Sequence, residues 1–199
     1  MQADPNLVDA ELEALSFDGV EWANRDAQGL RLSESQLRSA DLTEASVARA
    51  RLRDILVQEG SWANATGTDA SLSRVRFERV RLTGVDLSGS RLDNVTFSDC
   101  RLDLSSFRFA QLEIVHFESC RMGEADFYDA HLRSVTFEDC DLSGANLAGA
   151  TFENSDLRGC DLSGVQGADR LRGVRMPWAD VIRSAGELAA GIGIEVLDE

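Results

Sequence analysis

Four cysteines are the residues of this chain best suited to metal or redox chemistry, and they recur every 20 residues. They are Cys100, Cys120, Cys140 and Cys160. Side chains in one straight column cannot converge on a tetrahedral metal ion, and parallel Cβ vectors suit a disulfide poorly. We therefore expect no metal site and no cofactor, and we interpret the cysteines as small buried side chains in a reducing cytoplasm.

Two histidines are the other candidates for catalysis. His116 and His131 each precede a large apolar residue and are expected to point outward. No G-x-G-x-x-G, Walker or H-E-x-x-H pattern occurs, and no motif positions a Ser or Cys nucleophile beside either histidine. The sequence therefore predicts a protein that is not an enzyme and has no catalytic residues.

The cysteine spacing belongs to a repeat of five residues. A large apolar residue stands at every fifth position from Leu72 to Leu162, and a smaller one (Ala, Val, Ser or Cys) stands two positions before each. A helix has a period of 3.6 and a strand a period of 2, so neither explains the pattern. Twenty residues make four pentapeptides, which predicts a coil with four five-residue sides, stacked about 4.8 Å apart.

The corners of this coil are also visible in the sequence. Several glycines fall two residues after a large residue, where a positive φ would be favourable for glycine. The repeat weakens around Arg25 and Ala27, and again from Gly60 to Gly67. We expect distorted coils or a bulge at those two places.

Four segments carry the motif A-(D/N)-L-x-x most directly: Ala40-Asp41-Leu42, Ala125-Asp126-Phe127, Ala145-Asn146-Leu147 and Cys160-Asp161-Leu162. Over about residues 30–167 the chain resembles the pentapeptide-repeat family. The resemblance implies an all-β solenoid, a right-handed quadrilateral β-helix of about eight coils. We assign the β-helix to residues 15–169.

Caps are expected at both ends of the solenoid. Residues 1–14 are expected to form an N-terminal cap, for which Asp4-Pro5 favours a short helix over a first coil. Residues 170–199 are expected to form a C-terminal cap with a helix near 177–190 and a short extended segment at 193–197. One apolar stripe of that helix, which includes Trp178, Val181, Ile182 and Leu188, is expected to cover the last coil, to form a homodimer, or both.

Charge limits the classes of partner. The chain carries 35 acidic residues against 20 basic ones, a formal charge of −15, and every basic residue is Arg. This excess argues against broad binding of nucleic acid or anionic membranes. No apolar run could span a membrane, and the N-terminus does not resemble a signal peptide, so we predict a cytoplasmic protein.

The acidic charge is concentrated in the C-terminal half. One side of the coil is expected to present Asp99, Glu118, Glu138 and Asp139, with Asp141 and Asp156 on the next side. This group is either a solvated face or a surface that binds a partner. An Arg-rich waist over residues 49–81 interrupts the acidic charge, and its role is left open.

The resemblance implies a function for the acidic group. Members of the family from mycobacteria, which lack loop insertions, and plasmid-borne members bind DNA gyrase by mimicking DNA and confer quinolone resistance. This chain shows no insertion that shifts the repeat and is more similar to the mycobacterial type. The resemblance therefore implies a protein partner, DNA gyrase or a related topoisomerase, and the alternative is a scaffold for an unrelated partner.

Three apolar residues occupy successive corner positions that elsewhere hold polar residues or glycine. They are Leu104, Phe109 and Ile114. Exposed apolar groups of this kind often mark a contact surface. They are either a contact patch or residues covered by neighbouring side chains.

Overall fold

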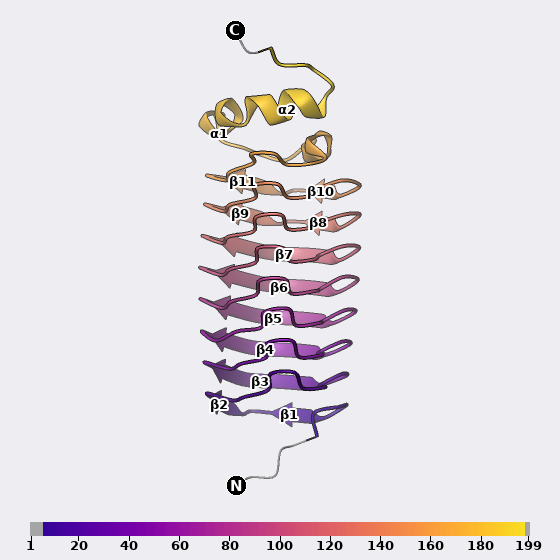
Figure 1. Ribbon diagram of the computed structural model, residues 1–199, viewed down its shortest axis with the longest axis vertical. Helices are drawn as coiled ribbons and strands as arrows, with labels where there is room; N and C mark the ends of the chain where they lie inside the picture. The colour runs from indigo at the N-terminus through magenta and orange to yellow at the C-terminus, as the bar shows by residue number, and fades with distance from the viewer. Residues whose placement is uncertain (1–5, 198–199) are drawn as a thin grey trace.

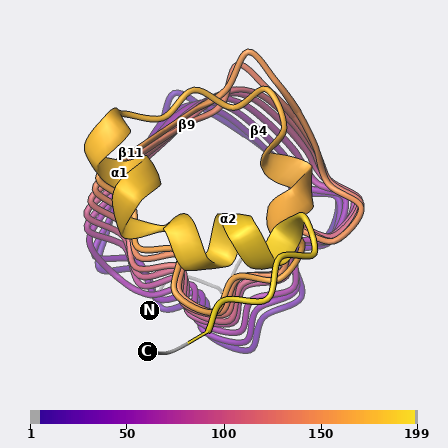
Figure 2. The ribbon, with the colours of Figure 1, turned by 90° about the horizontal axis from the view of Figure 1, so that it is seen from above.

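The protein is a parallel β-solenoid, which confirms the expected fold class. The computed structural model describes residues 6–197, and Figure 1 shows the strands stacked as successive levels of one column. Viewed along the column, the turns superimpose into a four-sided outline (Figure 2). The strands are β1 (Glu11–Glu13), β2 (Ser16–Asp18), β3 (Arg31–Arg38), β4 (Arg51–Gln58), β5 (Ser71–Glu78), β6 (Arg91–Ser98), β7 (Gln111–Glu118), β8 (His131–Arg133), β9 (Thr136–Glu138), β10 (Thr151–Glu153) and β11 (Asp156–Arg158).

Each residue pairs with the residue 20 positions later. Leu32 lies beside Leu52, which lies beside Leu72, and this register continues through all the paired strands. The strands supply two of the four sides, which we call side 1 (β1, β8, β10 and the first halves of β3–β7) and side 2 (β2, β9, β11 and the second halves). Isolated parallel bridges form the other two: side 3 contains Asp41↔Ser61, and side 4 contains Ser46↔Thr66.

Aromatic rings stack through the middle of the column. Phe97 and Phe117 are parallel, with ring centroids 4.9 Å apart, and Phe137 continues the stack at the same spacing. Phe107 and Phe127 form a second stack, and Phe107 meets Phe117 edge-on at 5.9 Å. The centroid spacing equals the distance between neighbouring strands, so the backbone register itself places one ring on the next.

Every corner contains a residue with a positive φ, two positions after the large residue, as the glycine pattern predicted. Gly84 and Gly144 occupy such corners with φ of 70° and 67°. Most of these corners, however, hold other residues, including the β-branched Ile114 at φ 54°. On sides 3 and 4 a turn hydrogen bond closes the corner; for example, the Ala45 amide donates to the Leu42 carbonyl at 3.0 Å.

The expected distortion near Arg25 does not occur, and between Gly60 and Gly67 it is limited to one residue: Gly60 has a φ of 82°, directly after the regular corner residue Glu59 at 62°. Ser61 and Thr66 pair in register with the turns on both sides of them, and the bridge Asp26↔Ser46 keeps the register near Arg25. A side chain on Gly67 would meet Leu87 and Val47 at 3.0 and 3.5 Å. The neighbouring turns therefore fill the space that the missing side chain leaves.

The N-terminal helix expected within residues 1–14 is absent from the part that the structure describes. Residues 6–14 contain a turn and strand β1, which pairs with β3, and Leu7 is buried against the core. The solenoid thus begins earlier than residue 15. The five-residue phase of Leu7 and Leu12 prevailed over the helix that Asp4-Pro5 favoured, and Asp4 and Pro5 themselves lie outside the described residues.

The C-terminal cap contains two short α-helices instead of one. After the 3-10 helix η1 (Ala168–Leu171) come α1 (Trp178–Arg183) and α2 (Ala185–Gly191), which are separated at Ser184, and residues 193–197 form no strand. Asp180 is buried, and its Oδ2 accepts a hydrogen bond from the Gly159 amide at 2.7 Å. This polar anchor turns the apolar stripe away from the column, so Trp178 and Ile182 are exposed while Val181 and Leu188 are half-buried.

The stacked core predicts that two Phe→Ala substitutions differ greatly in their effect on the free energy of unfolding. Replacing the buried Phe117 with Ala should lower the free energy of unfolding by about 3–5 kcal/mol, because it leaves a cavity between two parallel rings. Replacing the exposed Phe109 with Ala should change it by less than about 1 kcal/mol. Urea denaturation of both variants measures the difference, and equal losses would contradict the stacked core.

Candidate functional site

Four of the predicted acidic residues gather along one edge of the solenoid. Glu118 and Glu138 are paired neighbours on side 2, and Asp99 and Asp139 occupy the adjoining corner. All four side chains are exposed. Because carboxylates one turn apart repel each other, this edge is an electrostatically strained surface that a cationic partner would relieve.

Asp99 differs from the other three in its surroundings. It borders a hollow of about 300 Å³ whose other charged residues are Arg79, Arg81 and Arg101. Its negative charge is therefore offset by nearby arginines. The exposed acidic surface is centred on Glu118, Glu138 and Asp139, and we use the name acidic edge for these three residues.

Asp156 does not belong to the acidic edge. Its side chain is buried, and its Oδ2 accepts a hydrogen bond from Arg175 Nη2 at 2.9 Å, with Arg158 at 3.4 Å. Arg175 follows the last solenoid turn, so this pair joins the cap to β11. The expectation that Asp156 contributes to a partner-binding face is corrected: its position at the end of the column makes it structural.

Asp141 lies on side 3, around the corner from the acidic edge. Its Oδ1 accepts a hydrogen bond from the Ser143 amide at 3.0 Å. The same arrangement recurs at Asp161 with Ser163 and at Asp41 with Thr43, where hydrogen bonds from the hydroxyl residue lower the pKa of the aspartate. Asp41 and Asp161 therefore both close a local turn and present an ionised carboxylate, and Asp141 closes the same kind of turn.

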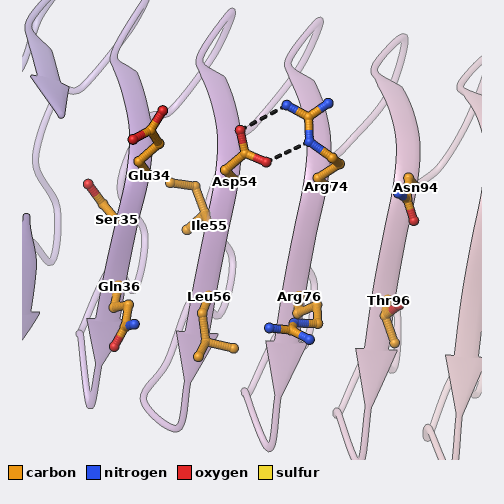
Figure 3. Close-up of a pocket in the computed structure, with 10 residues that line it drawn as sticks. All are labelled: Glu34, Ser35, Gln36, Asp54, Ile55, Leu56, Arg74, Arg76, Asn94 and Thr96. Carbon is orange, nitrogen blue, oxygen red and sulfur yellow. Dashed lines mark hydrogen bonds and ion pairs between the residues drawn. The ribbon is translucent and has the colours of Figure 1, made fainter. Parts of the chain in front are cut away.

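The arginines of residues 49–81 do not form one basic patch. Figure 3 shows Arg74 donating two hydrogen bonds to Asp54 across neighbouring turns, and this contact lowers the pKa of Asp54. Arg79 pairs with Glu59 at 3.6 Å. Arg76 lines the same open groove as Arg74, about 630 Å³ in volume, and faces outward with no ion pair among the described residues.

The three apolar corner residues are exposed, but they lie on three different corners of one turn. Leu104, Phe109 and Ile114 are 59%, 53% and 46% exposed. Successive corners are separated by a whole side of the coil, so the residues do not form the single patch that their spacing suggested. Phe109 instead belongs to a separate cluster: its ring meets Tyr128 edge-on at 5.7 Å, and the Arg108 guanidinium lies 4.5 Å from the Tyr128 centroid.

Two models of known protein families match the chain. A family model described as "Pentapeptide repeat region" matches residues 70–147, and one described as "Pentapeptide repeats (8 copies)" matches residues 48–89. Together they cover residues 48–147, just over half of the chain. The chain belongs to the pentapeptide-repeat family.

Solved structures of other pentapeptide-repeat proteins are similar in fold. HetL, involved in heterocyst differentiation regulation in the cyanobacterium Nostoc sp. strain PCC 7120, is 24% identical, with a TM-score of 0.51 over 85% of this chain and 88% of HetL. The full-length plasmid-mediated fluoroquinolone resistance protein QnrB1 is 16% identical, with a TM-score of 0.45 over 93% of this chain and 100% of QnrB1. A search of curated proteins gave no match.

The cysteines of this pentapeptide-repeat protein are free and buried in one interior column. Each thiol lies within hydrogen-bond reach of two backbone carbonyls, to either of which its one S–H can donate; Cys120 Sγ, for example, lies 3.3 Å from the Phe97 and Glu118 oxygens. Neighbouring thiols and burial raise the pKa of the Cys120 thiol above its ordinary value. Within residues 6–197 no group of three or more His, Cys, Asp or Glu could hold a metal ion, and no helix there is long and apolar enough to cross a membrane.

Two features of the surface escaped the sequence analysis. One is the contact of Arg108 with Phe109 and Tyr128, which joins residues of different turns. The other is the column formed by Arg81, Arg101 and Arg121 on side 3. Their spacing of 20 residues was the available signal, but counting charge by segments of the chain concealed it.

The burial of the thiols predicts that they are unreactive in the folded protein. A thiol reagent such as DTNB should label none of the four cysteines of the native protein within minutes and all four in denaturant, because the thiols lie inside the column, where the reagent cannot reach them. A Ser119→Cys variant, with a new thiol on an exposed corner, serves as the positive control. Rapid labelling of the native wild-type protein would contradict the buried column.

Proposed function

We propose that the protein acts without catalysis, by binding the DNA-binding groove of DNA gyrase or a related topoisomerase through its acidic edge. One observation carries the proposal: Glu118, Glu138 and Asp139 are exposed and have no ion pair among residues 6–197. Other acidic residues of the solenoid, such as Asp54 and Asp126, are paired with Arg74 and Arg108. The unpaired carboxylates are therefore free to meet arginine or lysine side chains of a partner.

The spacing of charge supports a partial imitation of DNA. Stacked turns place carboxylates about 4.8 Å apart along the column, whereas B-DNA carries one phosphate per about 1.7 Å of its axis. The acidic edge is thus sparser than a duplex. The acidic edge therefore matches only a limited part of a basic groove. The cations of the partner would lie against the C-terminal half of the rod.

Uninterrupted register also supports this proposal. Among the described residues, every turn from β1 to β11 keeps the same 20-residue spacing, so no loop protrudes between the acidic edge and a partner. A straight rod without side loops can lie lengthwise in a groove. This feature agrees with the resemblance to the mycobacterial members of the family.

A second candidate function is that of a scaffold for an unrelated protein. The observation that favours it is the exposed Phe109 ring, supported by Tyr128 and Arg108 on side 4. Aromatic and arginine side chains are enriched at protein interfaces. The cluster lies away from the acidic edge, so the two candidates can be separated by mutation.

A DNA gyrase supercoiling assay with titrated protein tests the first proposal. Wild-type protein should inhibit supercoiling or protect the enzyme from a quinolone. The variant Glu118→Gln/Glu138→Gln/Asp139→Asn should need a concentration higher by about 10-fold to 100-fold, because each lost charge pair is worth about 0.5–1 kcal/mol.

A matched variant controls for net charge. Glu44→Gln/Glu124→Gln/Glu153→Gln removes three exposed carboxylates from other parts of the surface, and it should inhibit as wild type does. No effect of wild-type protein at tens of micromolar would refute gyrase as the partner. Equal losses in both variants would show that overall charge, and not the acidic edge, is responsible. Loss of inhibition in Phe109→Ala alone would show that the cluster of Phe109, Tyr128 and Arg108, and not the acidic edge, contacts gyrase.

We also propose that the C-terminal cap forms a homodimer. Trp178 and Ile182 are 76% and 60% exposed, and Ile192, Ile194 and Leu197 extend the apolar surface beyond α2. A surface of this kind at the end of a rod fits a second copy placed end to end.

Light scattering tests this interface. The variant Trp178→Asp/Ile182→Asp should be monomeric at concentrations where wild type is a dimer, since it places charges in an apolar contact. Phe109→Asp introduces a charge at a similarly exposed apolar residue on the side of the rod and should remain dimeric. A salt-resistant dimer that survives the cap substitutions would exclude the cap as the interface.

A further inference from the structure

Side 3 carries an ordered sequence of charges that runs along the whole rod. Each member of its central column bridges to the next one a turn away, about 4.8 Å along the rod. Acidic residues begin the column, three arginines follow a serine, and two aspartates end it. From the N-terminal end the column reads Glu21, Asp41, Ser61, Arg81, Arg101, Arg121, Asp141 and Asp161.

The three arginines are only partly offset within the rod, where Arg81 and Arg101 border the hollow that also contains Asp99. In the described chain Arg81 and Arg101 form no ion pair, and Arg121 reaches only Asp103, at 3.9 Å, while 64% of its side chain is exposed. Like charges stacked in neighbouring strands repel each other. An anionic group from outside the rod would therefore relieve a repulsion that the fold itself maintains.

The two aspartates at the other end of the column are fixed in position by hydrogen bonds from the backbone. The Ser143 and Ser163 amides donate to Oδ1 of Asp141 and Asp161 at 3.0 and 2.9 Å. These bonds fix the carboxylates while each Oδ2 remains available. Little side-chain entropy is then lost when a guanidinium approaches.

The shape of side 3 also changes along its length. Around the aspartates the adjoining positions are Ser143 and Ser163, and the corner positions are Gly144 and Gly164, so this part is nearly bare. On the arginine part the corner positions are Gly84, Leu104 and the exposed Glu124, and Leu104 is 59% exposed. One part of the side therefore has a protruding apolar group, and the other has room for one.

From this pattern we infer that side 3 binds a second copy of the chain in the antiparallel direction. The twofold axis crosses side 3 between the turns of Arg121 and Asp141, so each column faces the same column of the partner in reverse order. Arg121 then meets the partner's Asp141, and Arg101 meets the partner's Asp161. Symmetry makes four such pairs, and Leu104 lies over the partner's Gly164.

A nucleic-acid strand fits this side less well than a second copy does. The positive stretch covers only three turns, and beyond it a phosphate backbone running along the rod would meet Asp141 and Asp161. The whole chain carries −15, which also repels a polyanion. The second copy offers both signs of charge in the required order.

The size of the contact sets its strength. A side five residues wide and four turns tall covers on the order of 300 Å² on each rod, less than the roughly 800 Å² per partner of a stable interface. The pairing is therefore reversible, visible at high protein concentration, and weakened by salt, because exposed ion pairs are screened. An apolar contact through the cap would persist in salt, which separates the two interfaces.

A charge exchange tests the proposal by sedimentation at high protein and low salt, in the Trp178→Asp/Ile182→Asp background. The unexchanged protein should form a reversible dimer. Arg101→Asp/Arg121→Asp and Asp141→Arg/Asp161→Arg should each be monomeric alone, because the four facing positions 101, 121, 141 and 161 then carry one sign of charge. An equimolar mixture of the two should dimerise again. Absence of a dimer before the exchange, or no rescue in a mixture of folded variants, would overturn the proposal.

Milder variants keep the test valid if the exchanged proteins fail to fold. Asp141→Asn/Asp161→Asn retains the Oδ1 acceptors and should weaken dimerisation by about tenfold or more. Arg51→Asp/Arg91→Asp makes on side 1 the same charge change as the arginine variant and should have no effect.

The proposed register would be overturned if Glu21→Gln/Asp41→Asn lost the dimer instead. A single-stranded oligonucleotide that binds wild type but not Arg101→Asp/Arg121→Asp, without any dimer, would assign the column to polyanions.

Discussion

The in-register hydrogen-bond ladder between turns is the constraint on which the rest of this structure depends. Because each residue lies beside the residue 20 positions later, the side chain at one position determines what its neighbours must accommodate. Inside the column this produces stacked phenylalanines at the strand spacing and a file of buried thiols. A side chain that does not match its neighbours above and below has no alternative place to go.

The same ladder acts on the outer surface, where it has the opposite effect on stability. Charges that are distant in the chain become neighbours, so Arg74 can satisfy Asp54, whereas Glu118 and Glu138 repel each other. Paired columns stabilise the rod. Unpaired columns reduce its stability and leave surfaces whose repulsion only another molecule can relieve. This distinction separates structural acids such as Asp156 from the acidic edge.

The solenoid and its corners could be predicted from sequence because core and turn depend on spacing alone: Leu32, Cys120 and Gly84 lie where the five-residue phase puts them. The ends could not, since Leu12 lies five residues from Leu7 but three from Leu15, and Asp180 turns α1 through a hydrogen bond that no pattern reveals. The grouping of Leu104, Phe109 and Ile114 failed because successive corners face different directions. The column of Arg81, Arg101 and Arg121 was not predicted, because residues that are neighbours on one side of the coil are 20 positions apart in the sequence.

The four-sided cross-section has a consequence for how such a chain can change. Inserting or deleting one pentapeptide would keep every later core residue in phase but would rotate the later surface by one side. Glu138 would then continue a different column, and pairs such as Arg133 with Glu113 would separate, while the buried rings would still alternate with small residues. Only a change of 20 residues preserves both interior and exterior. The alternation of large and small inward positions thus tolerates length variation in units of five residues, whereas the side-chain ladders of both interior and surface tolerate it only in units of 20.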